Sequence, residues 1–209
     1  RLGPREGVQV VVGDFLRSTP PAEAFQVVGN VPFSRTSDII AWCLSADRLV
    51  DATLITQLEY AKKRTGVYGR WSQLTVLTWP EFSWEIRGVV PRHQFRPVPR
   101  VDGGVLRVAR RPVSLLPAAT LPAYRRLVER GFIGVGGSLF ASLSRVYPRD
   151  RLGLAFKEAG VDRSTVVAFV TPDQWLTLFT ALGPGGTTKP PRTRSSMHRN
   201  SSERARRRR

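Results

Sequence analysis

The sequence contains few of the residues that build disulfides and metal centres. Its 209 residues include one cysteine, Cys43, and two histidines, His93 and His198. A single cysteine excludes an internal disulfide, and these few soft ligands form no credible zinc cluster, so we predict that the protein binds no metal. We expect Cys43 to be a small buried group on a helix.

Long apolar runs are also missing. No stretch approaches the roughly 18 uninterrupted apolar residues that a membrane-spanning helix requires, and residues 1–6 lack the apolar core of a secretion signal. We therefore expect a cytoplasmic protein that does not enter membranes. A hydrophobic content of 41% is enough for one core, or for one core and a small satellite domain.

Acidic residues are scarce relative to basic ones. The chain has 16 Asp and Glu against 33 Lys and Arg, which gives a formal net charge of +17. Nine of the basic residues and one Glu lie in residues 183–209, so residues 1–182 are strongly basic by themselves. Such a surface attracts polyanions. An acidic protein or an anionic membrane would also fit, but turns rich in aromatic and amide side chains favour nucleic acid.

A glycine-rich phosphate-binding turn is absent where it would be expected. In nucleotide-binding α/β domains it follows the first strand, and an acidic residue for the ribose comes about 20 residues later. The run Gly134-Val135-Gly136-Gly137 does not serve, because no strand pattern precedes it and it lies far along the chain.

The stretch that most strongly indicates chemistry is Asn30-Val31-Pro32-Phe33, which follows an apolar run at residues 25–28. Pro32 fixes its own φ and has no N–H, so the turn is stiff and its carbonyl groups are not paired in a ladder. The Asn30 amide and a neighbouring carbonyl can accept both hydrogens of an amino group, while Phe33 offers a flat face to a ring. We predict an aminated heterocycle as the ligand. The alternative is an ordinary loop, because Asn and Pro are common in turns.

A second apolar run, at residues 8–12, ends in Gly13-Asp14-Phe15 and predicts another buried strand. Ligands of open α/β sheets bind at the carboxyl ends of the strands, so we expect both turns to lie at one edge. There Asp14 would accept the amino hydrogens of an adenine, and the Phe15 backbone would donate to the ring. Alternatively, Asp14 caps the following turn and Phe15 belongs to the core.

Periodicity predicts the remaining elements. We expect a helix at residues 37–45, strands at 52–58 and 104–109, and either a helix and a strand or two strands at 74–79 and 84–90. Helical patterns follow residue 117, and Thr171-Pro172-x-Gln174 indicates a capped helix start. Their apolar stripes consist of Leu121, Tyr124, Leu127 and Val128; Leu139, Leu143 and Val146; and Leu152, Leu154, Phe156 and Ala159. The tail from residue 183 is rich in Pro, Gly, Ser and Arg and predicts disorder.

Two further segments are candidates for nucleic-acid contact. Basic and aromatic residues alternate from Lys62 to Trp71, which suits phosphates and stacked bases, although a solvated helix end explains the pattern as well. The candidate RNA-binding residues are Lys62, Lys63, Arg64, Arg70, Arg96 and Arg100. The last two lie in a proline-stiffened loop, Phe95-x-Pro97-x-Pro99, in which Phe95 by its pattern alone is a core anchor.

Four blocks in this order and spacing resemble the ribosomal RNA adenine N6-dimethyltransferases, over roughly residues 1–182. They are Val11-Val12-Gly13-Asp14-Phe15-Leu16, Val28-Gly29-Asn30-Val31-Pro32-Phe33, Gln57-Leu58-Glu59-Tyr60-Ala61-Lys62-Lys63-Arg64 and Phe95-Arg96-Pro97-Val98-Pro99-Arg100-Val101-Asp102. Two more, Trp42-Cys43-Leu44 and Leu74-Thr75-Val76-Leu77-Thr78-Trp79-Pro80, are similar to the Erm branch of actinobacteria. This likeness implies methylation of 23S ribosomal RNA and macrolide resistance.

The resemblance implies a fold, a cofactor and roles for residues. The fold would be α/β: the C-terminal part of a Rossmann-like methyltransferase sheet at residues 1–113, a small helical RNA-binding domain at 114–182 and the tail at 183–209. S-adenosylmethionine would be the methyl donor, held by Asp14, Phe15 and Asn30. Catalysis would fall to Asn30, Pro32, Phe33 and Phe95, with the two phenylalanines enclosing the target base.

The family's RNA-binding leader, glycine motif and ribose-binding acid have no counterpart here, so we expect a monomeric fragment of a longer enzyme whose partner is ribosomal RNA. Two other functions stay open. One is dimethylation of small-subunit (16S) ribosomal RNA, and the other is RNA binding without catalysis, since a fold does not fix a function. The helical domain, equally, needs no role beyond packing.

Overall fold

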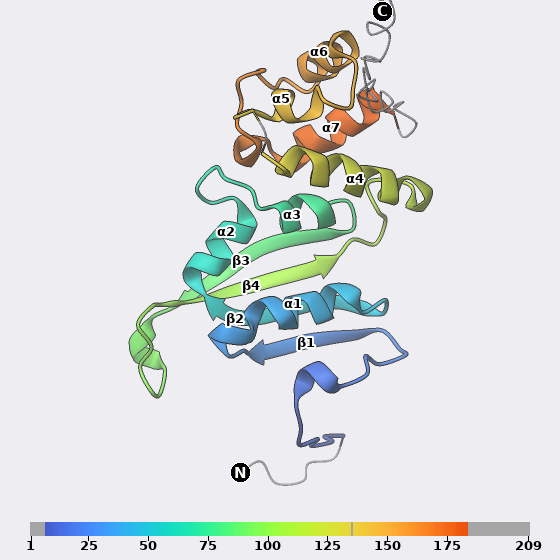
Figure 1. Cartoon of the computed structure of the whole chain (residues 1–209). Coiled ribbons are helices and arrows are strands. Elements are labelled where there is room, and N and C mark those ends of the chain that lie inside the picture. Colours follow the sequence, from blue (N-terminus) through green and yellow to red (C-terminus); the bar gives the residue numbers. More distant parts are fainter. Residues whose placement is uncertain (1–6, 135, 184–209) are drawn as a thin grey trace, which may run out of the picture.

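The computed structural model describes residues 7–134 and 136–183, in which strands and helices alternate along the first half of the chain (Figure 1). The strands are β1 (Phe25–Asn30), β2 (Leu49–Gln57), β3 (Phe82–Val90) and β4 (Gly103–Arg110). The α-helices are α1 (Thr36–Ser45), α2 (Leu58–Thr65), α3 (Gln73–Thr78), α4 (Leu121–Phe132), α5 (Leu139–Leu143), α6 (Arg149–Glu158) and α7 (Pro172–Leu182). Short 3-10 turns are η1 (Phe15–Arg17), η2 (Phe33–Arg35), η3 (Arg92–Gln94), η4 (Ala118–Thr120) and η5 (Val167–Phe169).

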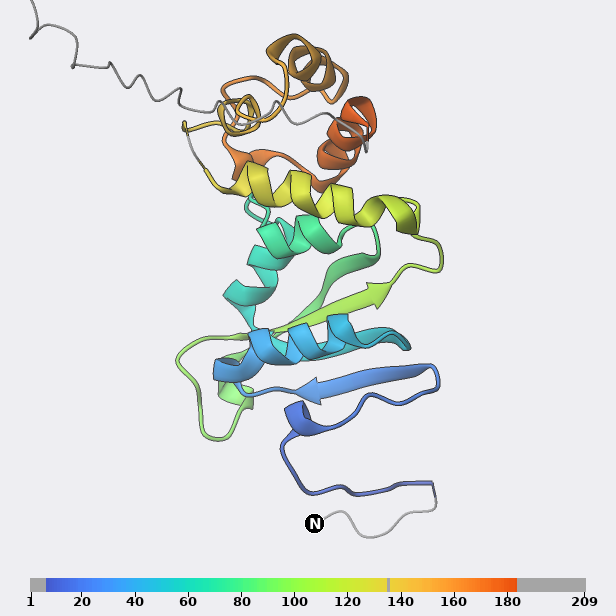
Figure 2. The same ribbon diagram turned by 45° about the vertical axis from the view of Figure 1, so that its right-hand side comes forward.

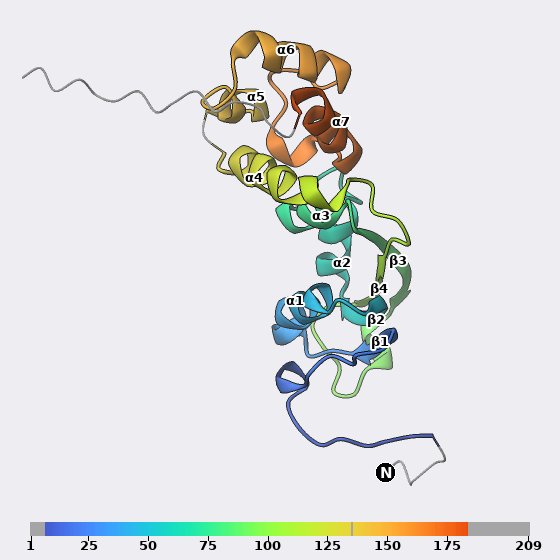
Figure 3. The same cartoon turned by 90° about the vertical axis from the view of Figure 1, so that its right-hand side faces the viewer.

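The strands form one sheet in the order β1-β2-β4-β3. β1 and β2 are parallel and joined by α1, whereas β4 is antiparallel to both of its neighbours. Figure 3 shows α1 and α2 together on one face of this sheet. A parallel pair with a crossover helix, extended by an antiparallel hairpin, confirms the predicted α/β class and the predicted elements at residues 37–45, 52–58 and 104–109.

The predicted buried strand at residues 8–12 is wrong. This segment contains no strand, and its valines are exposed, with Val12 at 95%. A strand is stabilised by pairing. Among the described residues β1 pairs only with β2, so its other edge is open, but residues 8–12 do not pair with that edge. β1 is itself only half buried, because Val28, on its open face, is 82% exposed while Val27 packs against the core.

Two groups of buried side chains hold the described residues together. One contains the sheet and α1 and runs in sequence from Val31 to Val108. The other unites the helices and, apart from Val76, runs from Leu116 to Leu182. The predicted boundary at residue 113 falls between them, and the division into domains stays a prediction. Val76 of α3 belongs to the second group, so α3 packs below α4 although it precedes β3 in the chain (Figure 2).

The helical patterns correspond to α4, α5, α6 and α7. In α7 the capping box is complete, because the Thr171 hydroxyl accepts from the Gln174 N–H at 3.2 Å and the Gln174 amide accepts from the Thr171 N–H at 2.9 Å. One expected core residue is wrong: Leu154 is 70% exposed. It lies two positions after Leu152, which at about 100° per residue places it on the opposite side of α6. The predicted tail lies outside the described residues, apart from its first residue, Gly183.

Tyr124 fastens the helices to α3. Its side chain is fully buried, its hydroxyl donates to the Val76 carbonyl at 2.9 Å, and burial raises the pKa of Tyr124, so that the donor stays protonated. Because the Val76 carbonyl also accepts from the Trp79 N–H at 3.3 Å, it keeps one partner when the hydroxyl is removed. Tyr124→Phe should therefore lower the free energy of unfolding by about 1 kcal/mol. Urea denaturation measures this, with the half-buried Tyr147→Phe as control; an equal loss in both variants would contradict the assignment.

Candidate active site

The Asn30 turn lies where β1 ends beside β2, with Asn30 in register with Ile55. Asn30 is exposed, and its side chain makes no hydrogen bond among residues 7–134 and 136–183. The turn around it is rigid, since the Val31 N–H donates to the Ile55 carbonyl at 3.3 Å and the Arg35 N–H to the Pro32 carbonyl at 2.9 Å. An amide that has no partner in the described part of the chain is thus held on a fixed backbone at the carboxyl end of a parallel strand.

Asn30 lies at a pocket of about 210 Å³ that otherwise has mainly apolar walls. It is lined by Phe15, Val27, Val28, Gly29, Asn30, Val31, Pro32, Ile39 and Leu54. Its size is below the roughly 300–1,000 Å³ of ordinary ligand pockets, so it suits one part of a nucleoside-sized ligand. The structure therefore brings the candidates Phe15, Asn30 and Pro32 to one place. The wall residues Ile39 and Leu54 were assigned by sequence only to apolar runs, and no polar signal distinguished them.

Asp14 does not line this pocket, and it caps the turn that follows it. Its carboxylate oxygen Oδ1 accepts from the Leu16 N–H at 3.0 Å, which begins η1. Phe15 packs against Trp42, with ring centroids 4.4 Å apart, and the Trp42 indole N–H donates to the Ser18 carbonyl at 3.0 Å. These contacts hold η1 against α1, although residues 7–14 contain no strand. The cofactor role of both candidates stays a prediction.

Phe33 and Phe95 come together as an aromatic pair. Their ring centroids are 6.3 Å apart with an interplanar angle of 68°. The connection between β3 and β4, which carries Phe95, lies at the same end of the sheet as the carboxyl end of β1 (Figure 1). Two rings in edge-to-face contact leave no space in which a flat base could stack between them. For a base to bind there, one of the rings has to rotate. Their role in catalysis stays a prediction.

Two residues that the sequence reasoning left without a role shape the Phe95 connection. The Asp102 carboxylate accepts from the Arg92 N–H at 2.8 Å and closes the loop. A methyl group on Gly103 would come within 2.9 Å of the Phe95 ring, so only glycine leaves that ring its place. An Asp followed by Gly-Gly at the end of a proline-rich loop was the available signal.

The basic candidates for RNA binding differ in whether their side chains are exposed or engaged in contacts within the protein. Arg64 points inward, because it donates to the Ser72 hydroxyl at 2.8 Å and lies over the Tyr60 ring, so it ties α2 to α3. Lys62 donates to Glu59 at 3.3 Å, and interactions with Tyr68 and Glu59 raise the pKa of Lys62. Lys63, Arg96 and Arg100 are exposed, and Arg70 lies over the exposed Phe169 ring. RNA binding by these residues stays a prediction.

Three further sequence predictions concern Cys43, metal ligands and membrane spans. Cys43 is fully buried on α1, and burial raises the pKa of its thiol to about 11, in agreement with the small apolar role predicted for it. Within residues 7–134 and 136–183, no group of three His, Cys, Asp or Glu side chains could hold a metal ion. No helix in those ranges has both the length and the apolar character to cross a membrane.

The chain was also compared with known proteins. A family model described as ribosomal RNA adenine dimethylase matches residues 1–183. An rRNA adenine N-6-methyltransferase of Streptomyces fradiae is 56% identical over 177 residues, which cover 85% of this chain and 56% of the relative. The chain spans about half the length of the curated relatives it matches.

Solved structures are similar as well. The crystal structure of the 23S rRNA methyltransferase ErmE matches with a TM-score of 0.82 and 51% identity, over 85% of this chain and 72% of that one. A dimethyladenosine transferase from Plasmodium falciparum matches with a TM-score of 0.67 over 88% of this chain and 76% of that one. At 18% identity this second likeness concerns the fold alone.

Proposed function

Because the chain belongs to the ribosomal RNA adenine dimethylase family, we propose that the protein methylates N6 of an adenine in 23S ribosomal RNA with S-adenosylmethionine as donor. The observation that carries this proposal is the Asn30 amide, which has no hydrogen-bond partner among the described residues and is fixed at the end of β1, three residues before Phe33 of the Phe33–Phe95 pair. The reaction would take place in the cytoplasm, where ribosomes are found, and the protein would act as a monomer. Modified 23S RNA would protect the ribosome from macrolides.

The residues of this turn address the difficulty of the reaction. The lone pair of an adenine amine is delocalised into the ring, so N6 is a poor nucleophile. Asn30 Oδ1 would accept one amino hydrogen, and the Pro32 carbonyl would accept the other. This carbonyl already accepts from the Arg35 N–H at 2.9 Å and, at 3.5 Å, from the Thr36 hydroxyl. The hydroxyl also donates to the Phe33 carbonyl at 3.1 Å, so it would keep that partner when an amino hydrogen takes its place on Pro32. Two acceptors favour a nitrogen closer to tetrahedral and stabilise the positive charge that grows on it.

The target adenine has to leave its base stack to reach the turn. Stacking on Phe33 and Phe95 would offset the unstacking free energy, which is a few kcal/mol. Rotation of either half-buried ring opens the edge-to-face pair for a flat base. The two phenylalanines thus position the base, while Asn30 and Pro32 act on its amino group.

The pocket residues fit part of the methyl donor. Phe15, Ile39 and Leu54 offer apolar walls to an adenine ring, and the second carboxylate oxygen of Asp14, Oδ2, has no partner in the described residues. When bound, S-adenosylmethionine supplies an electrophilic methyl group on a sulfonium. The chain's own contribution is to hold the adenosine end and to keep Asn30 at the mouth of the pocket.

The proposal is tested by calorimetric titration of the purified protein with S-adenosylmethionine, and then by transfer of labelled methyl groups to 23S or 16S transcripts. Digestion of the RNA and chromatography should reveal N6-methyladenine or N6,N6-dimethyladenine in the 23S transcript only. Modification of 16S RNA alone would favour the small-subunit reaction. Binding of RNA without binding of the donor would favour a non-catalytic RNA-binding protein.

A further inference from the structure

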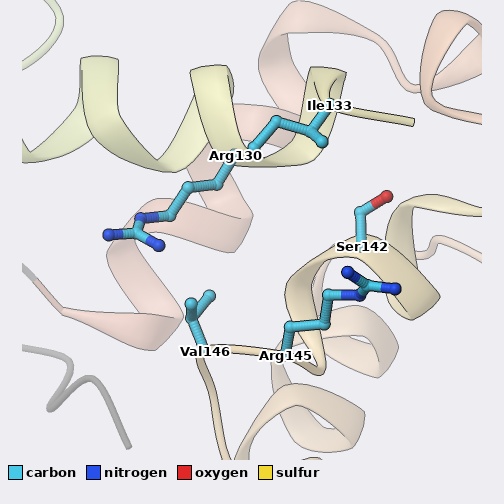
Figure 4. A pocket seen from close by; sticks show the side chains of 5 residues that line it. All are labelled: Arg130, Ile133, Ser142, Arg145 and Val146. Atoms are coloured by element: carbon cyan, nitrogen blue, oxygen red, sulfur yellow. The ribbon is translucent and has the colours of Figure 1, made fainter. Parts of the chain in front are cut away.

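A small pocket between α4 and α5 lies outside the site described above. Its volume is about 90 Å³, and it is lined by Arg130, Ile133, Ser142, Arg145 and Val146 (Figure 4). Arg130 and Ile133 come from the end of α4, and the others from α5 and the turn after it. In Figure 4 the Arg145 guanidinium lies beneath Ser142, while that of Arg130 extends past Val146 on the other side.

The pocket has a concentrated positive charge around it. Arg126 lies one helical turn before Arg130, and the charges of Arg130, Arg151 and Arg126 all act on Tyr147, the residue after Val146. Like charges four residues apart on a helix repel each other and destabilise it. The helix therefore carries a repulsion that a bound anion would relieve.

Three of these arginines have no polar partner in the described part of the chain. Among residues 7–134 and 136–183, the side chains of Arg126, Arg130 and Arg145 form no ion pair or hydrogen bond. Neighbouring Arg125, in contrast, is bound to Glu81 at 2.9 Å. A guanidinium group is suited to phosphate, because its planar set of donors can bind two oxygens at once.

We propose that this pocket binds one phosphate of the RNA backbone, with Arg145 as a direct ligand and Arg126 as a supporting charge. The Arg130 guanidinium, which extends past Val146, would swing back to become the second ligand. The identity of the anion as RNA rests on the function proposed above. The volume of about 90 Å³ is well below the roughly 300–1,000 Å³ of ordinary ligand pockets, so the pocket suits a group of the size of a phosphate. Ile133, which is 68% exposed, and Val146 would contact the adjoining ribose.

The test is the binding of a labelled single-stranded RNA of about 20 nucleotides to the full chain, measured by fluorescence anisotropy from about 0.05 to 0.2 M salt. Removing one phosphate contact makes the plot of log K against log salt less steep by about 0.7. At about 0.1 M salt this corresponds to an RNA affinity about fivefold weaker. We expect this loss for the double variant Arg130→Ala/Arg145→Ala. Arg130→Lys/Arg145→Lys keeps both charges and should recover most of the slope.

Arg48→Ala/Lys157→Ala serves as control, because it removes two exposed charges outside the pocket and the slope should change by less than about 0.2. Equal losses in the two alanine variants would overturn the inference, since the attraction would then be diffuse. The inference would also be overturned if Arg130→Ala/Arg145→Ala kept its RNA affinity but no longer bound phosphatidylserine vesicles. That result would assign the arginines to a membrane surface. The assay needs no methyl donor, so a protein that binds here but does not methylate would contradict the proposed function alone.

Discussion

Replacing Asn30 by alanine is expected to lower the rate of methyl transfer by about 10²- to 10³-fold, the loss typical of removing one polar group that stabilises a transition state. The variant loses the acceptor Oδ1 that would bind the N6 hydrogens. The fold should not change, because the side chain is exposed and unbonded within the described residues, and such surface substitutions alter stability by about 0.5 kcal/mol or less. Transfer of labelled methyl groups at saturating RNA, with a thermal melt alongside, measures both effects.

Two further variants make this result specific. Asn30→Asp keeps an acceptor oxygen at the same place and should recover part of the lost rate. Gln73→Ala removes an exposed amide at the start of α3, away from the turn, and should transfer methyl groups at the parent rate. Full activity of Asn30→Ala would refute the role of Asn30, whereas a melting temperature that falls in parallel with the rate would assign the loss to folding.

Gly131→Ala is expected to destabilise the protein by about 2 kcal/mol. On helix propensity alone, alanine in place of a helical glycine stabilises by up to about 1 kcal/mol. Here the added methyl group would overlap the Trp175 ring and come within 2.6 Å of the Leu139 side chain, and both side chains are fully buried. Overpacking of a closed core costs about 1–3 kcal/mol, which exceeds the gain in propensity. Urea denaturation measures the difference.

Gly153→Ala on α6 is the matched control. There the added methyl group meets only the guanidinium end of Arg163, at 2.5 Å. This side chain is exposed and flexible, and it can shift while its guanidinium stays over the Phe140 ring. The stability of that variant should equal or exceed that of the parent, by up to about 1 kcal/mol. Similar changes in the two variants would show that the Trp175 contact does not decide the outcome.

The sequence predicted local structure best where a single physical signal was enough. The capping residues Thr171 and Gln174 and the spacing of Tyr124 and Leu127 specify helices by their own chemistry, and both predictions were confirmed. Residues 8–12 show the limit. Their β-branched side chains favour an extended chain, but whether a strand forms depends on a partner, which local sequence does not show.

The candidate site was predictable to a similar degree. The turn at Asn30 follows from an apolar strand and a proline, and the sequence order placed Phe15 near it. The packing of η1 decides which side of Phe15 is buried. The packing of the connection at residues 91–102 decides that Phe33 meets Phe95 edge to face. The pocket between α4 and α5 could not be foreseen, because its arginines come from separate segments and look in the sequence like ordinary solvated charges.

The position of α3 has a consequence for how the protein unfolds. This helix sits between β2 and β3 in the chain, yet Val76 is buried with the helices, the Trp71 N–H donates to the Ala168 carbonyl at 2.7 Å and the Trp79 indole donates to Asp173 at 2.9 Å. Unfolding of the helices α4 to α7 would therefore remove the contacts that hold α3. The segments on either side of α3, which lead to α2 and to β3, would then become less ordered. The two halves are interlocked, so their loss of structure should be cooperative, and cutting the chain near residue 113 would not release two self-sufficient units.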